Sequence, residues 1–322
     1  MSVPQIQEGT AMSVALKGKD FLSLHDWTRA ELEYVLEVAR QFKLRKLAGM
    51  VEQPLKGKTL GMYFSKASTR TRLSFEVGIQ QLGGTGLFLS AADLQLRRGE
   101  SIADTARVFS RYLDGIMIRT FAHSDVVEMA QYADIPVING LTDQEHPCQV
   151  MADLLTIQEK KGRLSGLKLA YVGDGNNMAH SLMDGGAKFG MHVAVACPPG
   201  YEPAPAIVDR AVSVAAAHGG KVEVLHDPVT AVRGADVVYT DVWASMGQEA
   251  ESAERMARFQ GYQVNAKLMA LAHPSAIFMH CLPAHRGEEV TADVIDGPQS
   301  VVFDEAENRL HAQKAIMALI MA

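Results

Sequence analysis

Short apolar runs alternate with longer stretches of helical periodicity along most of the chain, and this alternation restricts the fold more than any other feature. The runs typical of β-strands cover residues 59–64, 87–89, 115–118, 136–138, 167–172, 192–197, 222–225, 237–240, 276–279 and 301–303. Strands that alternate with helices form βαβ units, which build parallel sheets covered by helices on both faces. We therefore predict an α/β fold with two doubly wound parallel-sheet domains, each of roughly four to six strands.

The length of 322 residues is consistent with two domains, at about 150 residues per domain. We place the first domain at residues 1–150 and the second at 151–304, with a helix near 149–160 bridging them. Residues 1–16 carry the features of a flexible tail, since they lack the apolar core of a signal peptide and the arginines of a transit peptide. A final helix over 305–322 is expected to pack back on the first domain.

Composition excludes several classes of protein. The net charge of −6 argues against a surface built to bind nucleic acid, and no run of about 18 apolar residues offers a membrane span. Three scattered cysteines, Cys148, Cys197 and Cys281, do not make a disulfide framework, and no C-x-x-C pair indicates structural zinc. We therefore expect a reduced cytoplasmic protein without a metal.

Dense polar or glycine-rich segments follow many of the expected strands. They cover residues 65–72, 119–120, 143–149, 173–177, 241–247 and 280–286. Ligands of open α/β sheets bind beyond the carboxyl ends of the strands. Because these segments all fall at that edge, we predict a shared active-site cleft between the two domains.

The motif Ser68-Thr-Arg-Thr-Arg72 is the most specific of these segments. It lies between a strand and a helix, so hydroxyl groups and backbone N–H groups converge at a helix N-terminus. Arginine adds forked donors that suit phosphate. The alternative is an ordinary helix cap followed by solvated arginines, but the alternation of hydroxyl and guanidinium groups exceeds what capping needs.

Other candidates are weaker by themselves. Arg119 ends an apolar strand and needs an anion, water or a salt bridge at the sheet edge. His146-Pro-Cys-Gln149 places an imidazole and an amide near the same edge, although a lone histidine is more often structural. Gly173-Asp-Gly-Asn-Asn177 resembles a dinucleotide loop, but it lacks the third glycine at Met178. Its asparagines fit better as polar ligands of a small substrate.

The cluster His280-Cys-Leu-Pro-Ala-His-Arg286 raises the possibility of zinc or of a cysteine nucleophile. Its spacing matches no zinc pattern. Adjacent side chains on an extended strand point to opposite faces, so we expect His280 and Cys281 to face apart. A distant histidine such as His146 stays open as a partner for Cys281.

Four motifs together resemble the aspartate/ornithine carbamoyltransferase family, in the order expected and over residues 17–322. They are Ser68-Thr-Arg-Thr-Arg72, His146-Pro-Cys-Gln149, Asp241 with Ser245-Met-Gly247, and His280-Cys-Leu-Pro283. The first two are typical of the whole family, and the last two are similar to those of its ornithine-specific members. The resemblance implies transfer of a carbamoyl group from carbamoyl phosphate to L-ornithine, giving L-citrulline and phosphate.

The resemblance also implies roles for individual residues. It assigns carbamoyl phosphate to Ser68, Thr69, Arg70, Thr71, Gln95, Arg119, His146, Gln149, Cys281, Leu282 and Arg309. It assigns ornithine to Asn177, Asp241, Ser245 and Met246, and the catalytic set to Arg70, Arg119, His146, Asp241, Cys281 and Arg309. Gln95 looks like the residue that reaches the site of a neighbouring subunit, which implies a homotrimer or a multiple of trimers.

The implied chemistry needs no metal and no organic cofactor, because carbamoyl phosphate already carries a good leaving group. Three alternatives remain open. One is a carbamoyltransferase for another amine, such as putrescine or an acylornithine. The others are a dinucleotide-dependent oxidoreductase and a non-catalytic binding protein of the same fold.

Overall fold

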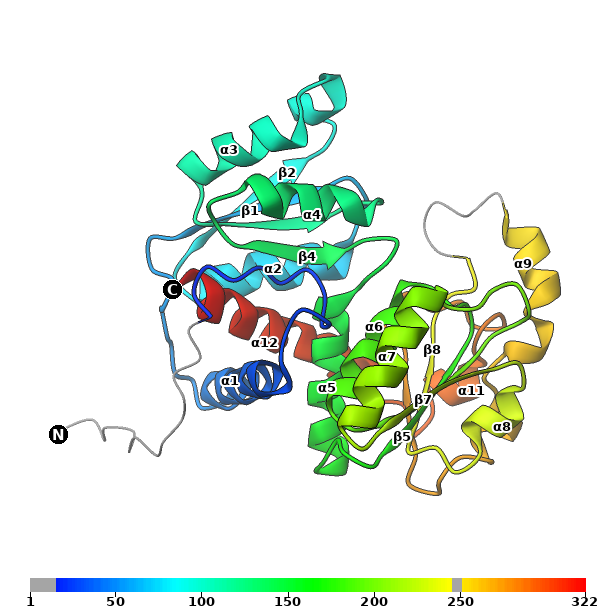
Figure 1. Ribbon diagram of the computed structural model, residues 1–322. Coiled ribbons are helices and arrows are strands. Elements are labelled where there is room, and N and C mark those ends of the chain that lie inside the picture. Colours follow the sequence, from blue (N-terminus) through cyan, green and yellow to red (C-terminus); the bar gives the residue numbers. More distant parts are fainter. Residues whose placement is uncertain (1–15, 245–250) are drawn as a thin grey trace.

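The computed structural model describes residues 16–244 and 251–322, which form two α/β units joined by long helices (Figure 1). Leu16, the last residue of the expected tail, is buried in the core, and Gly18 N donates to Ile320 O at 2.8 Å. Residue 16 therefore already belongs to the packed chain. None of the helices among the described residues is both long enough and apolar enough to cross a membrane.

The first sheet has four parallel strands in the order β2-β1-β3-β4. Its strands are β1 (Thr59–Phe64), β2 (Thr85–Ser90), β3 (Gly115–Arg119) and β4 (Val137–Leu141). Its helices are α1 (Arg29–Leu47), α2 (Thr69–Gln81), α3 (Ile102–Tyr112) and α4 (His123–Tyr132), with the 3₁₀ turn η1 (Gln95–Arg98) after β2. β2 pairs only with β1, so it is an edge strand.

The second sheet has five parallel strands in the order β7-β6-β5-β8-β9. Its strands are β5 (Lys168–Val172), β6 (His192–Ala196), β7 (Lys221–Leu225), β8 (Val237–Thr240) and β9 (Ile277–Met279). The helical elements are α6 (Asn177–Lys188), α7 (Pro205–Ala217), α8 (Pro228–Val232), α9 (Ser252–Arg258), η3 (Gln260–Tyr262), α10 (Ala266–Met269) and α11 (Ala292–Ile295). The predicted fold of two doubly wound parallel-sheet domains is confirmed.

Two long helices connect the units. α5 (Pro147–Lys161) runs from the end of β4 toward the second sheet, and α12 (Val302–Met321) returns the chain to the first. α12 packs against α1, α2 and α5, and Lys314 on α12 donates to Gln81 at the end of α2 at 3.1 Å. This return places residues near both ends of the sequence beside the same sheet.

The expected strand over residues 301–303 is wrong. Only one isolated bridge, between Ser300 and Phe278, continues the second sheet there. α12 begins at Val302, and Glu305 N donates to Val301 O at 2.9 Å to close its first turn. Asp304 and Glu305 both lie in that turn, where negative charge is favourable at the positive end of the helix dipole.

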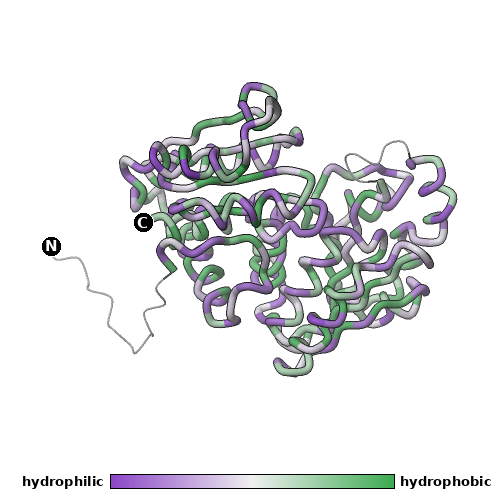
Figure 2. Tube along the Cα trace, turned by 45° about the horizontal axis from the view of Figure 1, so that its top comes forward, coloured by the Kyte–Doolittle hydropathy of each residue, from purple (hydrophilic) through white to green (hydrophobic). Residues whose placement is uncertain are grey.

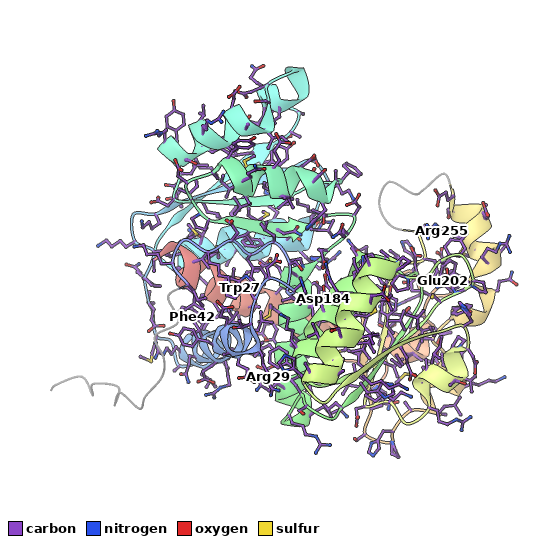
Figure 3. All side chains as sticks on the ribbon, viewed as in Figure 1. Trp27, Arg29, Phe42, Asp184, Glu202 and Arg255 are labelled. Carbon is purple, nitrogen blue, oxygen red and sulfur yellow. The ribbon has the colours of Figure 1, made fainter. Side chains whose placement is uncertain are left out.

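Hydrophobic residues are frequent along the strands (Figure 2), and the buried core side chains come from the strands and from the helices that pack on them. α1 illustrates the local cause. Thr28 and Glu31 form a complete capping box, which satisfies backbone N–H groups at the helix start. Leu32, Val35, Leu36, Ala39 and Phe42 then fall on one face and are buried. Figure 3 shows Trp27 and Phe42 within this first unit, with Arg255 on α9 at the far end of the second.

Candidate active site

The N-terminus of α2 follows β1 by a few residues, and it carries the first predicted motif. Ser68 is the N-cap, and its Oγ accepts a hydrogen bond from Thr71 N at 3.2 Å. Thr69 is exposed, Arg70 is half-buried and Thr71 is buried in the first turn. Ser68 therefore does cap the helix, as the alternative interpretation of the motif as an ordinary helix cap predicts. Of the residues after it, Thr71 is in contact with side chains of other elements.

Two buried guanidinium groups converge on Thr71 from other elements. Arg119 Nη1, at the end of β3, lies 3.4 Å from Thr71 Oγ1, and Arg309 Nη2, on α12, lies 3.2 Å from it. Burial, with the positive charges of Arg309 and Arg70, lowers the pKa of Arg119 to about 9. Among the described residues neither Arg119 nor Arg309 has a carboxylate within ion-pair distance. Buried cations without an ion-paired carboxylate favour an anion beside them.

His146 is held beside these cations at the start of α5. Its backbone N–H donates to Ser181 Oγ at 2.8 Å. Burial and the charges of Arg309, Arg119 and Arg70 keep the pKa of its imidazole well below the usual 6.5, so the ring is neutral at physiological pH. Within the described chain, His146 Nδ1 and Arg119 Nε are buried without a hydrogen-bond partner. These two atoms are therefore available at the site for hydrogen bonds to a ligand.

Gln149, one turn into α5, connects the cations to a buried acidic pair. Its Oε1 accepts from Arg309 Nη1 at 2.6 Å. Its Nε2 donates to Asp153 at 2.9 Å and to Glu305 at 3.0 Å. Glu305 also accepts from the hydroxyl of Tyr239, on β8, at 3.0 Å. This network reaches from the first sheet to the second.

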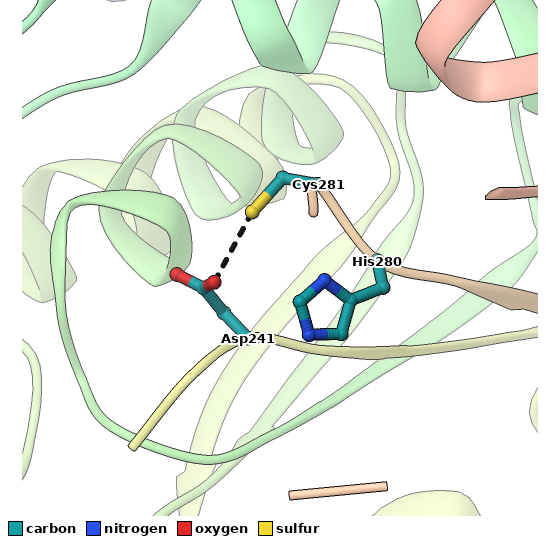
Figure 4. Close-up of side chains that lie close together, drawn as sticks. All are labelled: Asp241, His280 and Cys281. Carbon is teal, nitrogen blue, oxygen red and sulfur yellow. Dashed lines mark hydrogen bonds between the residues drawn. The ribbon is translucent and has the colours of Figure 1, made fainter. Parts of the chain in front are cut away.

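The second sheet contributes Asp241 after β8 and Cys281 after β9. The Cys281 thiol donates to Asp241 Oδ1 at 3.1 Å (Figure 4), and Asn176 Nδ2 donates to Asp241 Oδ2 at 3.0 Å. Burial, reinforced by the negative charge of Asp241, holds the pKa of the thiol well above 9. Cys281 lies close enough to Arg119 and Arg309 for a charge on its sulfur to interact with both guanidinium groups. The groups from the two sheets therefore belong to one site.

The expectation that His280 and Cys281 face apart is wrong. β9 ends at Met279, so strand alternation no longer governs the next two side chains. The atoms of Asp241, His280 and Cys281 that could ligate a metal ion all lie within 4.8 Å of one another. Figure 4 shows the three side chains together. Both ring nitrogens of His280 already have partners, since Nε2 lies 3.1 Å from Glu289 and Nδ1 accepts from Leu282 N at 2.9 Å. These partners compete with any metal for the imidazole.

Asn177 and Leu282 occupy different surroundings. Asn177 opens α6, and its Nδ2 donates to Thr142 O at 2.6 Å, so its amide ties the second unit to the loop that carries His146. Leu282 has a φ of 56° and is followed by a cis bond to Pro283. Its backbone N–H is taken by His280.

The glycine-rich loop after β5 is shaped by packing. A Cβ at Gly175 would lie 2.2 Å from Pro203 N, so only glycine fits beside that segment. Asn176, and not Asn177, contacts Asp241; its Oδ1 also caps α6 by accepting from Met178 N at 2.9 Å. The loop thus supports the acidic residue of the site through its asparagine side chain.

Most of the predicted residues are thus brought together. Hydrogen bonds or direct electrostatic contacts join Arg70, Thr71, Arg119, His146, Gln149, Asp241, Cys281 and Arg309. Gln95 is exposed on η1 and takes part in none of these hydrogen bonds. Ser245 and Met246 lie outside the described residues.

Sequence reasoning missed Asp153, Glu305 and Tyr239. A signal was present, because Gln149 and Asp153 are four residues apart on α5, as are Glu305 and Arg309 on α12, which places each pair on one helix face. Charged residues facing inward on buried helices need partners. Which residues those partners are depends on α12 returning to α5.

Two family models match almost the whole chain. The carbamoyl-P binding domain of aspartate/ornithine carbamoyltransferase matches residues 19–159, and the Asp/Orn binding domain of the same family matches residues 165–320. The two matches correspond to the two sheets.

Curated and solved relatives are similar over nearly their full lengths. An ornithine carbamoyltransferase of Symbiobacterium thermophilum is 75% identical over 307 residues, which is 95% of this chain and 99% of that protein. The solved ornithine carbamoyltransferase from Pyrococcus furiosus is 60% identical, with a TM-score of 0.93, covering 96% of this chain and 98% of that one. The solved ornithine transcarbamoylase from Giardia lamblia is 36% identical, with a TM-score of 0.85 and coverage of 94% and 97%.

Proposed function

The chain belongs to the aspartate/ornithine carbamoyltransferase family, and from that premise we propose that it is an ornithine carbamoyltransferase of arginine metabolism. The reaction transfers the carbamoyl group of carbamoyl phosphate to the side-chain amine of L-ornithine, giving L-citrulline and phosphate. The observation that carries the proposal is the group of guanidinium cations around a neutral histidine, with the Asp241–Cys281 pair beside it.

We assign the phosphate of carbamoyl phosphate to the start of α2. The first N–H groups of a helix have no partner within the helix, and they attract anions together with the helix dipole. Ser68, Thr69, Arg70 and Thr71 add hydroxyl and guanidinium donors in the same turn. Arg119 contributes a buried cation that no described carboxylate neutralises.

The carbonyl oxygen of the substrate belongs beside His146. The lowered pKa of this imidazole leaves it neutral, so it donates or accepts a hydrogen bond without adding positive charge. Negative charge develops on that oxygen when the amine attacks, and donors fixed in a buried site stabilise it strongly. Arg119 and Arg309 supply such donors, and Gln149 lies within hydrogen-bond distance of Arg309.

The amine is received by the second unit, at Asp241 and Cys281. Only the neutral amine has a lone pair for attack, whereas a free alkyl amine is mostly protonated at neutral pH. Its nitrogen forms a bond to the carbonyl carbon, the bond from that carbon to the phosphate oxygen breaks, and phosphate leaves with the electron pair. The amine proton leaves with phosphate or with solvent. The raised pKa of Cys281 argues for a protonated thiol that orients groups and against a cysteine nucleophile.

We assign the remaining contacts to ornithine to Asn177, Ser245 and Met246. The last contact to the carbamoyl group is assigned to the Leu282 backbone. Asn177 lies at the start of α6, close to the loop before α5 through its bond to Thr142 O. Holding both substrates in one site converts a reaction between two molecules into an effectively intramolecular one.

We also propose a homotrimer, or a multiple of trimers, with Gln95 completing the site of a neighbouring subunit. Exposed apolar side chains on α2 and on the edge strand β2 support this assembly. Leu73 and Val77 on α2 and Leu87 and Phe88 on β2 are between 37% and 55% exposed. Edge strands and contiguous apolar patches are usually covered in soluble proteins.

A direct assay tests the proposed activity. The purified chain should form citrulline from carbamoyl phosphate and L-ornithine, with phosphate released in equal amount. Putrescine, L-lysine and N-acetylornithine in place of ornithine distinguish the alternative acceptors. A clear preference for any of these amines, or no citrulline at high enzyme concentration, would contradict the proposal.

A further inference from the structure

Two carboxyl groups lie directly beneath Gln149, on the side away from the guanidinium cluster. Asp153 on α5 and Glu305 on α12 are both 0% exposed. They accept hydrogen bonds from the same Gln149 Nε2, at 2.9 Å and 3.0 Å, so the two carboxyl groups lie side by side. Two buried carboxyl groups this close repel one another once both are charged, so the pair shares a proton and holds it to higher pH than two separate carboxyl groups would.

The pair fixes which way the Gln149 amide points. Both hydrogens of its NH₂ group are donated to the carboxyl pair, so the amide oxygen must face Arg309 Nη1, 2.6 Å away. In the reversed orientation the NH₂ group would face another donor, the Arg309 guanidinium, and the amide oxygen would face the two carboxyl acceptors. Both hydrogen-bonding arrangements would then be lost. An amide oxygen has two lone pairs, and Arg309 uses one of them. The other can accept a hydrogen bond at the guanidinium cluster.

Glu305 extends this control to the second sheet. Its Oε1 also accepts from the Tyr239 hydroxyl at 3.0 Å, and its Oε2 accepts from His280 N at 3.0 Å. Tyr239 lies two residues before Asp241, and His280 lies directly before Cys281. Burial raises the pKa of both carboxyl groups, but three donors converge on Glu305 and one, from Gln149, reaches Asp153, so we place the negative charge on Glu305 and the shared proton on Asp153.

Resting on the proposed function, we infer that Asp153 and Glu305 are positioning residues that set the specificity of the carbamoyl site. They hold Gln149 with its oxygen toward the guanidinium cluster, where it accepts a hydrogen bond from the amino group of carbamoyl phosphate. Acetyl phosphate carries a methyl group at that position and has no hydrogen to donate. The buried pair thus selects carbamoyl phosphate over acyl phosphates, without touching the substrate.

Two substitutions of equal size separate this role from simple packing. Glu305→Gln replaces one carboxylate oxygen with an NH₂ group, so the side chain can no longer accept from all three donors and its hold on the Gln149 amide is weakened. Asp153→Asn keeps an oxygen that can accept from Gln149. Its NH₂ group can donate to Glu305, just as the proton on Asp153 does in the wild-type chain. The measured quantity is the ratio of the inhibition constant of acetyl phosphate to the KM of carbamoyl phosphate in citrulline formation. Where turnover is too slow to measure, calorimetry at low temperature gives the corresponding ratio of the dissociation constants of acetyl phosphate and carbamoyl phosphate.

We expect Glu305→Gln to lower this ratio about three- to tenfold, the worth of one hydrogen bond, while Asp153→Asn stays within about twofold of wild type. Asp153→Leu, which removes the acceptor and keeps bulk, should also lower the ratio, and it serves if Glu305→Gln does not fold. An unchanged ratio in a folded Glu305→Gln or Asp153→Leu chain overturns the inference, as does an equal fall in Asp153→Asn. Failure of the wild-type chain to form citrulline counts against the proposed function instead.

Discussion

The thiol of Cys281 donates a hydrogen bond to Asp241 over 3.1 Å, although the two residues follow different strands of the second sheet. Asn176 donates to the other oxygen of the same carboxylate at 3.0 Å. The carboxylate is therefore held from two sides before any substrate arrives. Because burial and the charge of Asp241 keep the pKa of the thiol well above 9, Cys281 acts as a hydrogen-bond donor and not as a thiolate.

Substitution of Cys281 tests this donor role. Cys281→Ser keeps a hydrogen on the side chain and should change kcat/KM for ornithine by no more than about threefold. Cys281→Ala removes the donor and should lower it by about tenfold or more. Iodoacetamide should react with Cys281 far more slowly than with free cysteine at pH 8, as mass spectrometry of the labelled peptide would show. Rapid alkylation there would contradict a protonated, buried thiol.

Asp241→Asn should weaken ornithine use and leave carbamoyl phosphate nearly untouched. The neutral amide cannot accept from both Cys281 and Asn176 in the same way, and it loses the charge that attracts the substrate amine. We expect KM for ornithine to rise about tenfold or more, with KM for carbamoyl phosphate within about twofold. Asp209→Asn, at an exposed position of α7, is the matched control. Equal effects on both substrates would mean that the division between the two sheets is wrong.

Arg70→Ala should remove most turnover while the chain stays folded. The side chain is half-buried and serves charge more than packing. Loss of one preorganised donor to developing charge typically lowers kcat by about a hundredfold or more. Initial rates of citrulline formation measure this loss, and circular dichroism checks the fold. Arg29→Ala, at a half-buried arginine that pairs with Glu33 at the start of α1, should keep the wild-type rate.

The acidic pair predicts how stability depends on pH. Burial raises the pKa of Asp153 from 3.8 to about 7 in the folded chain, so folded protein holds this proton more tightly than unfolded protein does. The stability that this proton contributes is full at low pH and is lost as pH rises through about 7. Asparagine has no such proton.

The free energy of unfolding of Asp153→Asn, relative to wild type, should therefore rise from pH 5 to pH 8 and then level off. Urea denaturation at fixed protein concentration measures this difference, since oligomerisation would otherwise shift it. Asp209→Asn should show a difference that does not vary over the same range. If the free energy of unfolding of Asp153→Asn relative to wild type fell from pH 5 to pH 8, Asp153 would not hold a proton more tightly in the folded chain.

The proposed trimer predicts complementation between inactive chains. Each proposed site combines Arg70 of one subunit with Gln95 of its neighbour, so Gln95→Ala and Arg70→Ala should each inactivate every site of a uniform trimer. A mixed trimer contains some sites in which both residues are wild type, and these should be active. Co-expression of the two variants should give more citrulline per chain than either alone. Sedimentation velocity should give three chains or a multiple of three. Activity in a monomer would rule out the shared site.

Local sequence rules identified most of the first sheet and the polar helix start that follows its first strand. Ser68 is the N-cap that the alternative interpretation offered, because capping depends on neighbours within four residues. Anion binding by the residues after it stays a prediction, and Arg72 pairs with Glu76. The expected strand over residues 301–303 was wrong because its apolar residues begin a helix, whose first turn is closed by Glu305 N and Val301 O. Strand alternation also failed for His280 and Cys281, since β9 ends one residue earlier.

By itself the sequence determined the alternation of strands and helices, the two sheets and the polar residues at their carboxyl edges, because hydrophobic periodicity and capping are local properties of the chain. Only the tertiary structure decided which distant side chains meet. Arg309 bonds to Thr71 and Gln149 because α12 returns across the first unit, and Glu305 becomes the common acceptor of Gln149, Tyr239 and His280. Such contacts are set by how helices pack on sheets, and no spacing along the chain specifies them.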